Sequence, residues 1–367
     1  MVRVTFLVTP FKIPMIERMA RHFSSKIQHQ LVTPTYPGIQ GDWARLSKWQ
    51  KLDAQLLGGQ SMREQIRQFE PDVIYADNAI YASQFRIVSL LSNQAPPLIL
   101  HLRGDWWREY WAWFASAPSR KRLLSIQQYA YNWAAIVLAR KVAPTCKWLE
   151  CVVRHYVPGK KSEVVYQGVE PDEFYQQGGF EFSKPAVAII QNHSIYPKVA
   201  GLLQFRRVAE KLPAVHFYIA EGEQTGQQLL PTVKQHFANL KNVHFVPGVT
   251  NLESVRKMLT ASDCYVLASG LDCCPSTVLE ASLMQLPVVV SKVGGVPELV
   301  RENETGWTIE NSDTDAWVEI IRTLANDREL AKKLGMQGRK WVSENFSWPR
   351  IAKQVERIIT EEAESRS

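Results

Sequence analysis

Two acidic side chains, Asp272 and Glu280, stand eight positions apart in the sequence with a Pro-Ser-Thr turn between them. Thr277 and Glu280 have the spacing of a capping box, in which a Thr caps a helix and a Glu three residues later returns to the cap. The surroundings indicate a second use of the same stretch. A helix that begins near Thr277, and another after the double glycine at 294–295, would present backbone N–H groups that can hold phosphates. The stretch could therefore bind a charged, phosphate-containing ligand.

Short apolar runs alternate with helical patterns along the whole chain, and these elements would have to position the two carboxylates. Such alternation indicates parallel sheets covered on both faces, hence an α/β fold. The expected strands are residues 2–8, 73–75, 98–102, 186–190, 215–220, 243–246, 264–268 and 288–290. The expected helices include residues 60–69, 125–140, 199–212, 252–261, long helices within 313–345, and 347–364.

The length of 367 residues suits two domains of about 150–200 residues each. The stretch 171–184 has little periodicity and contains Gly178-Gly179, so we place the domain boundary there. Two doubly wound domains joined at that point would leave a ligand-binding cleft between their strand carboxyl ends.

The composition is that of a soluble globular protein, with 46% hydrophobic and 22% charged residues. No apolar run approaches the roughly 18–20 residues that span a bilayer, and the run at residues 2–8 is too short for a signal peptide. The five cysteines form no CxxC pair. This pattern favours reduced thiols and a cytoplasmic protein.

Positive charge is concentrated in the first half of the chain. Residues 1–170 carry 22 lysines and arginines against 12 aspartates and glutamates, a net charge of +10, whereas residues 171–367 carry 21 against 24, a net charge of −3. A basic first half indicates an anionic partner such as a membrane surface, a nucleic acid or an acidic substrate. A basic surface kept for solubility is the alternative. The basic residues are dispersed and form no recognised nucleic-acid motif, so we do not expect nucleic acid.

Several short motifs occur in the order and spacing of a known family. They are Asp272-x7-Glu280, Gly294-Gly295-x-Pro-Glu298 with Thr305-Gly306, the segment 164–170 with Phe174, Ile219-Ala-Glu-Gly222, and Phe346-Ser-Trp348. Together they resemble the retaining glycosyltransferases of the family-4 (glycosyl transferases group 1, glycogen-synthase-like) type, which have the GT-B fold. The resemblance implies two Rossmann-like doubly wound domains that face each other across a cleft. It implies an acceptor domain at 1–170, a linker at 171–184, a nucleotide-sugar donor domain at 185–346, and a C-terminal helix at 347–367 that crosses back to the N-terminal domain.

The resemblance also implies roles for the residues around the two carboxylates. Glu280 would hold the ribose hydroxyls of the nucleotide, and a carboxylate suits a vicinal diol because it can accept two O–H bonds. Asp272 would contact the hydroxyls of the donor sugar, although the family commonly has Glu at this position. The donor diphosphate would be held by the turn Ser276-Thr277-Val278, and Gly248 would complete the donor-binding set.

The stretch His193 to Lys198 departs from the family pattern of Arg-x4-Lys. Lys198 stands where the family has a lysine that binds the diphosphate, and His193 replaces the arginine, which would be a stronger phosphate anchor. Lys198 would stabilise the departing diphosphate, work that a metal does elsewhere. The alternative for Lys198 is a solvated lysine that opens a helix, although a cation there opposes the helix dipole unless an anion joins it.

The N-terminal half matches the family less well. Residues 9–14 stand where the family often has Gly-Gly near the donor diphosphate. At the end of another strand the family places a catalytic histidine, and the register leaves both His101 and Arg103 as candidates. The two side chains point the same way along a strand. The alternatives are that His101 is a hydrogen-bonded core histidine and that Arg103 pairs with Asp105.

Four tryptophans crowd into residues 106–113, with Arg108 among them and Arg120-Lys121-Arg122 after them. Aromatic residues beside cations suit a membrane interface or a platform for sugar rings, so Trp106, Trp107 and Arg108 are the expected acceptor-binding residues. A helix that packs into its own domain is the alternative.

The expected function is metal-independent transfer of a sugar, with retention, from a nucleotide-diphosphate donor to a glycan or lipid-linked acceptor. The expected catalytic residues are Lys198, His101, Arg103 and Asp272, with no metal ligand and no cofactor beyond the nucleotide sugar as co-substrate. We expect a cytoplasmic protein that also meets the anionic inner face of the membrane. Two other functions stay open: a non-catalytic protein that binds sugar nucleotides or glycans on the same scaffold, and a nucleotide-sugar epimerase.

Overall fold

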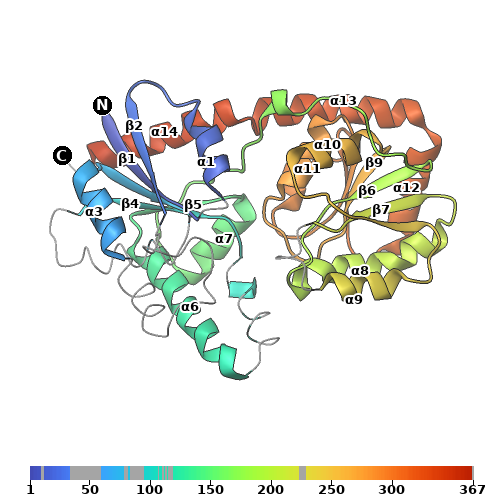
Figure 1. Ribbon diagram of the computed structural model, residues 1–367, viewed down its shortest axis with the longest axis horizontal. Helices are drawn as coiled ribbons and strands as arrows, with labels where there is room; N and C mark the ends of the chain where they lie inside the picture. The colour runs from blue at the N-terminus through green and yellow to red at the C-terminus, as the bar shows by residue number, and fades with distance from the viewer. Residues whose placement is uncertain are drawn as a thin grey trace. The chain divides into compact units, whose positions relative to one another are not determined.

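The computed structural model describes residues 1–9, 12–33, 59–77, 82, 95–105, 107–109, 111, 114, 119–222 and 229–365. The chain folds as two compact units (Figure 1). The N-terminal unit comprises Met1–Tyr166 together with Trp348–Ser367, and the C-terminal unit comprises Gln167–Ser347. The chain therefore leaves the N-terminal unit, builds the C-terminal unit, and returns for its last helix.

The N-terminal unit has a five-stranded parallel sheet in the order β2-β1-β3-β4-β5. The strands are β1 (Val2–Leu7), β2 (Ile27–Val32), β3 (Val73–Ala76), β4 (Leu98–Leu102) and β5 (Lys141–Pro144). The main helices are α1 (Ile13–Ala20), α3 (Gly59–Phe69), α6 (Ser119–Leu138), α7 (Lys147–Tyr156) and α14 (Trp348–Glu364). This strand order, with the first strand between the second and the third, is a doubly wound one.

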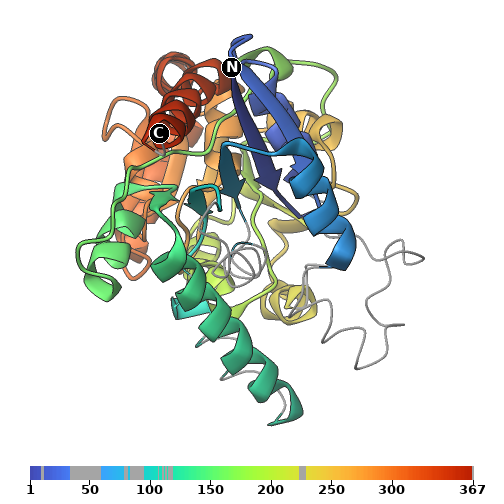
Figure 2. The ribbon, with the colours of Figure 1, turned by 90° about the vertical axis from the view of Figure 1, so that its left-hand side faces the viewer.

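Helices cover both faces of this sheet, and Figures 1 and 2 show α14 and α6 on opposite sides of it. The central strands β3 and β4 are wholly buried because each face of the sheet meets a helix. The core on one face joins Val4 and Phe6 of β1, Ile16 of α1, and Ile351 and Val355 of α14. The last helix of the chain is therefore part of the first unit's core.

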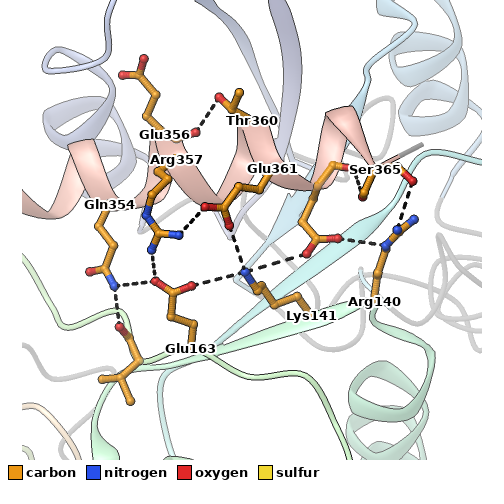
Figure 3. Close-up of polar contacts among 11 residues, drawn as sticks. Arg140, Lys141, Glu163, Gln354, Glu356, Arg357, Thr360, Glu361 and Ser365 are labelled. Carbon is orange, nitrogen blue, oxygen red and sulfur yellow. Dashed lines mark hydrogen bonds and ion pairs between the residues drawn. The ribbon is translucent and has the colours of Figure 1, made fainter. Parts of the chain in front are cut away.

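A network of charged and polar side chains also fastens α14 to the sheet (Figure 3). The Lys141 ammonium lies 3.3 Å from a carboxylate oxygen of Glu163 and 3.7 Å from one of Glu361. The Arg357 guanidinium pairs with both of these glutamates, and the Gln354 side-chain amide donates to Glu163 at 3.1 Å. The Glu163 carboxylate therefore links Lys141 of β5 to Gln354 and Arg357 of α14.

The C-terminal unit has a six-stranded parallel sheet in the order β11-β10-β9-β6-β7-β8. The strands are β6 (Ala186–Ile189), β7 (His216–Ala220), β8 (Val243–Val246), β9 (Cys264–Leu267), β10 (Val288–Ser291) and β11 (Gly306–Ile309). The helices are α8 (Tyr196–Lys211), α9 (Leu230–Phe237), α10 (Leu252–Thr260), α11 (Ser276–Leu283), α12 (Thr314–Asn326) and α13 (Arg328–Asn345), and the 3-10 turns are η3 (Pro171–Glu173) and η5 (Val296–Leu299). Three strands on either side of a central reversal give the Rossmann order.

Residues 171–184 pack against this sheet and its helices. The Arg339 guanidinium donates to the carbonyl oxygens of Pro171 at 3.2 Å and Phe174 at 2.7 Å. The ring of Phe182 stacks on Tyr218 of β7, with 3.6 Å between the ring centroids. In the structure this segment belongs to the C-terminal unit.

The predicted strands and helices are present with shifts of a few residues at their ends, and three strands were missed. The middle of β2 is Gln28-His29-Gln30, so its pattern is too polar to indicate a strand. The strands β5 and β11 are only four residues each and contain Lys, Pro or Gly.

Among the described residues, no helix is long and apolar enough to cross a membrane.

The network at Glu163 predicts a pH-dependent contribution to stability. Burial alone would raise the pKa of Glu163, but the hydrogen bond from Gln354 and the charges of Arg357 and Lys141 lower it below its ordinary value of 4.5. A carboxyl whose pKa is lower in the folded state stabilises the protein above the unfolded pKa, and this stability is lost as pH falls through the folded pKa. We expect Glu163→Gln to reduce the free energy of unfolding in urea at pH 7, with a smaller difference from wild type at pH values below 4.5. An equal difference at both pH values would contradict the prediction.

Candidate functional site

The strand order of the C-terminal sheet reverses between β6 and β9, which are neighbours. The strands β7 and β8 follow on the β6 side, and β10 and β11 follow on the β9 side. Parallel sheets of this kind bind ligands at such a switch point, outside the carboxyl ends of the strands. The loop after β6 carries His193 and leads to Lys198 in the first turn of α8. The loop after β9 carries Asp272 and leads into α11, which contains Glu280. The sheet therefore gathers the main predicted donor-binding residues at its switch point.

Lys198 and Asp272 form an ion pair across this switch point. The Lys198 ammonium lies 3.7 Å from Oδ2 of Asp272, and the side chains are 22% and 19% exposed. Lys198 is the third residue of α8, where a cation opposes the helix dipole. The carboxylate of Asp272 offsets that cost. The pair is thus accessible to a ligand and has an electrostatic reason to form without one.

The loops around Asp272 approach each other so closely that two positions require glycine. A Cβ atom on Gly270 would lie 2.4 Å from the Pro197 carbonyl oxygen, and one on Gly294 would lie 2.0 Å from the Asp272 carbonyl oxygen. Gly294 also has a φ of +53°, which side-chain-bearing residues rarely adopt. The Gly295 N–H donates to the Asp272 carbonyl oxygen at 3.1 Å. These contacts hold the backbone of Asp272, in the loop after β9, against the loop after β10.

The helix α11 does not begin with a capping box, so that prediction was wrong. The helix starts at Ser276 with Pro275 as its N-cap and has no side-chain cap. Proline at the cap position leaves the first N–H groups of the helix without a side-chain acceptor. The Val278 N–H bonds to the Pro275 carbonyl oxygen at 3.3 Å, which leaves Ser276 and Thr277 as the residues of the turn best placed to donate to a phosphate. Glu280 lies one turn after Ser276, on the same side of the helix.

Tyr265 of β9 contacts the start of this helix through its hydroxyl. This residue was not identified from the sequence. Its hydroxyl lies 2.7 Å from Oγ1 of Thr277 and 2.8 Å from the carbonyl oxygen of Ile190. Burial raises the pKa of Tyr265, and the nearby carboxylates of Glu280 and Asp272 raise it further, against the hydrogen bond with Thr277, which lowers it. The phenol therefore stays protonated and ties the loop after β6 to α11. Its only sequence signal is a tyrosine in a short apolar strand.

The remaining predicted donor-binding residues occupy different environments. His193 is fully buried, so its imidazole belongs to the interior of the loop after β6. Gly248 follows β8 with a φ of +73°, and β8 is the edge strand beyond β7. The structure thus brings Lys198, Asp272 and the start of α11 together. His193 is buried in the loop after β6, and Gly248 follows β8, two strands away from β6.

The N-terminal sheet has its own switch point between β1 and β3, and a charged cluster lies there. Asp77 follows β3 and its side chain is fully buried. The Lys12 ammonium at the start of α1 lies 3.5 Å from Oδ2 of Asp77, and Nε of Arg103 lies 3.4 Å from the same oxygen. Burial lowers the pKa of Lys12 despite the charge of Asp77, and Glu109 is close enough to act on the same ammonium. Sequence reasoning missed Lys12 and Asp77, whose only signal is their place at strand ends.

His101 is a buried histidine whose two ring nitrogens are both hydrogen-bonded. Nδ1 lies 2.8 Å from the Tyr75 hydroxyl and Nε2 lies 3.2 Å from the Val165 carbonyl oxygen. Because that carbonyl can only accept, Nε2 carries the proton. Burial, followed by the charges of Arg103 and Lys12, lowers the pKa of His101 well below its ordinary value of 6.5. The imidazole is neutral and supports Arg103, whose Nη2 lies 3.3 Å from Nδ1.

The predicted acceptor-binding residues separate into packed and exposed side chains. Trp107 is buried and stacks on Tyr156 with 4.6 Å between ring centroids, which is the packing alternative. Arg108 is exposed and lies 3.5 Å from Asp105, so Asp105 pairs with Arg108 and Arg103 pairs with Asp77. Trp106 lies outside the described residues.

Within the part of the chain that the structure describes, no three His, Cys, Asp or Glu side chains are grouped as a metal site.

Comparison with known proteins identifies the family that the C-terminal unit resembles. Residues 194–341 match the family model described as glycosyl transferases group 1. A curated relative, N-acetyl-alpha-D-glucosaminyl L-malate synthase of Bacillus anthracis, is 25% identical over 208 residues, which is 55% of this chain and 54% of that protein. The chain spans about half the length of the curated relatives it matches. The resemblance expected from the motifs is confirmed.

Solved structures confirm the two-domain GT-B fold. The sucrose-phosphate synthase of Thermosynechococcus elongatus superposes with a TM-score of 0.78 at 15% identity, covering 98% of this chain and 99% of that chain. HepE of Anabaena, solved with UDP-glucose, superposes with a TM-score of 0.71 at 15% identity, covering 98% of this chain and 100% of that chain. At this identity the likeness establishes the fold alone.

The contact between Gly294 and Asp272 makes Gly294→Ala a sharp test of the loop geometry. We expect this variant to lower the free energy of unfolding by more than about 1 kcal/mol, because the new Cβ meets a backbone oxygen in a conformation disfavoured for alanine. Gly178→Ala is the control, since a Cβ there has no atom within 4 Å. Urea unfolding of the two variants measures the difference, and equal stabilities would refute the geometry.

The buried carboxylate of Asp77 predicts a second effect on stability. We expect Asp77→Ala to lower the free energy of unfolding by about 3–5 kcal/mol, because Lys12 and Arg103 lose the carboxylate between them. Asp315→Ala is the control, since Asp315 is 86% exposed in its ion pair with Lys211 and the loss of an exposed pair should have little effect on stability. Urea unfolding followed by circular dichroism compares the two, and a similar small cost for both would show that the cluster does not depend on Asp77.

Proposed function

We propose, on the premise that residues 194–341 form a group 1 glycosyltransferase domain, that the protein transfers a sugar from a nucleoside diphosphate to a hydroxyl group of an acceptor. The observation that supports this most strongly is the meeting of Lys198, Asp272 and the first turn of α11 at the switch point of the C-terminal sheet. The HepE structure was solved with UDP-glucose, which supports a nucleotide sugar as the donor here.

Each group at this switch point has a role in the proposed reaction. Glu280 accepts hydrogen bonds from the two ribose hydroxyls, and the start of α11 donates to the diphosphate. The Lys198 ammonium, which pairs with Asp272, turns to the diphosphate when the donor binds. Asp272 then becomes an acceptor for the sugar hydroxyls. The donor thus replaces one ion pair by two favourable contacts.

The proposed chemistry breaks the bond between the anomeric carbon and the diphosphate oxygen and forms a bond between that carbon and the acceptor oxygen. Positive charge develops on the sugar and negative charge on the diphosphate. Lys198 and the N–H groups of α11 stabilise the negative charge electrostatically. The proton of the acceptor hydroxyl passes to the departing diphosphate. We propose retention at the anomeric carbon, with no metal ion and no cofactor other than the donor.

The N-terminal unit would bind the acceptor, a glycan or a lipid-linked sugar. Arg103 is the candidate to contact a substrate there, because its side chain is 14% exposed at the end of β4. His101 is buried and hydrogen-bonded, so we propose it as a positioning residue that holds Arg103. A cytoplasmic location at the anionic face of a membrane fits the net charge of +10 on residues 1–170.

A second candidate function rests on the burial of His193. If the imidazole in the loop after β6 gives the diphosphate little charge stabilisation, the scaffold could bind a sugar nucleotide without transferring the sugar. A panel of nucleotide sugars that raises the melting temperature, together with no nucleotide release in the presence of any acceptor, would favour this function. Nucleotide release that requires an acceptor would favour transfer.

The donor-binding roles predict a loss of activity in two variants. Lys198→Ala and Glu280→Ala should each reduce transfer by at least about a hundredfold, because each removes a charged contact to the donor, while the melting temperature stays close to wild type. Lys211→Ala is the control on the same helix, since Lys211 pairs with the exposed Asp315. Glu253→Ala is the control for a lost glutamate, since Glu253 pairs with Lys257 on α10.

Nucleotide released from the donor, followed with time and with product identified by mass spectrometry, is the measurement. Full activity in both Lys198→Ala and Glu280→Ala would reject the proposed function. Equal losses in the control variants would show that the effect is not specific to the switch point.

A further inference from the structure

The helix α6 carries an apolar stripe on its exposed side. Ile126, Trp133 and Val137 are 55%, 38% and 42% exposed, and Ala130 between them is also exposed. Their spacing of four, three and four residues places all of them on one side of the helix. Four exposed apolar residues in one line, with no polar residue among them, are unusual on a helix of a soluble protein.

The opposite side of α6 is buried against its own unit. Asn132, Ala135 and Ile136 are buried there, and the helix contacts β4. Trp107 also lies beside residues of α6, among them Tyr129 and Ile136. Apolar residues therefore lie on both sides of the helix, and packing within the unit explains only those of the buried side.

The exposed side forms a shallow apolar hollow. Figure 2 shows that α6 extends beyond the sheet at one end. The hollow is lined by Tyr129, Ala130, Trp133, Ala134, Val137 and Leu138. Its aromatic members combine apolar rings with a polar N–H or O–H group. Such side chains favour the boundary between a lipid bilayer and water, where one end is apolar and the other is hydrated.

The charge of α6 favours an anionic occupant. Residues 119–138 include Arg120, Lys121 and Arg122 and have no acidic residue. The net charge of residues 1–170 is +10. A second copy of the chain would bring another basic helix against this one, because a two-fold interface pairs identical surfaces. A bilayer with anionic headgroups would attract the basic residues and accept the apolar stripe.

We propose that α6 is a membrane-docking element whose stripe of Ile126, Ala130, Trp133 and Val137 inserts into the headgroup region of an anionic bilayer. A helix of this kind lies in the plane of the interface with its apolar face about 5–10 Å below the headgroups. This deepens the proposed function, on which its biological meaning rests, because it would place the N-terminal unit beside a lipid-linked acceptor. Vesicle binding needs neither donor nor transfer, so the two proposals can fail separately.

Co-sedimentation of the full chain with vesicles tests the docking element. The vesicles are phosphatidylcholine alone and phosphatidylcholine with phosphatidylglycerol. We expect wild type to pellet with the anionic vesicles only, and to be released at about 1 M NaCl, where screening is nearly complete. The double variant Trp133→Glu with Val137→Glu should bind the anionic vesicles at least about tenfold more weakly, because two charges replace apolar groups at the interface.

The control for this variant is Met336→Glu, since Met336 is 49% exposed on α13 in the other unit. It should bind like wild type. Equal binding by all three proteins, or binding by none, would overturn the proposal. A wild-type dimer in analytical ultracentrifugation that the double variant converts to a monomer, without vesicle binding by either, would assign the stripe to self-association instead.

A second measurement covers the case in which the double variant unfolds. Anionic vesicles with brominated acyl chains quench tryptophans that enter the bilayer. We expect the fluorescence of wild type to be quenched more than that of Trp133→Phe, while Trp133→Phe keeps its affinity for the vesicles. Equal quenching of the two proteins would show that Trp133 does not reach the lipid.

Discussion

The approach of the loop after β9 to the first turn of α8 is the contact on which the candidate donor site depends. Gly270 allows the loop to touch the Pro197 carbonyl oxygen, and Gly294 allows the next loop to reach the Asp272 backbone. With any side chain at these two positions the loops would have to move apart, because the new Cβ atoms would lie 2.4 Å and 2.0 Å from backbone oxygens. Such a shift would change the 3.7 Å separation of Asp272 and Lys198. Backbone packing thus determines the electrostatics of the site.

Each unit has an ion pair or ion cluster at the switch point of its sheet, and the two differ in burial. In the C-terminal unit the Lys198–Asp272 pair is partly exposed, so a ligand can exchange partners with it at little cost in desolvation. In the N-terminal unit Asp77 is fully buried between Lys12 and Arg103, so its charge must stay compensated in place. The first arrangement suits an exchangeable ligand, and the second suits a rigid support for Arg103.

The sequence was sufficient for the α/β class, for most strands and for the positions of Lys198, Asp272 and Glu280, because hydrophobic runs and motif spacing are local properties. It was not sufficient for Asp77 or Tyr265, whose importance depends on which strands become neighbours. It also led to the wrong prediction of a capping box at Thr277. The helix starts one residue earlier, at Ser276, and Pro275 is its N-cap. The burial of His193 and Trp107 likewise depends on how distant segments pack together, and the residue pattern within one segment does not show this.

The return of α14 to the N-terminal unit has a consequence for how the protein is made. The core of that unit includes Ile351, Val355 and Ile358, which leave the ribosome after every residue of the C-terminal unit. During synthesis the C-terminal unit therefore has its complete sequence first, although it is encoded second. The α14-facing side of β1 stays uncovered until residues 348–364 have been translated. Domains that fold as they emerge usually do so from the N-terminus, and here the order of completion is reversed.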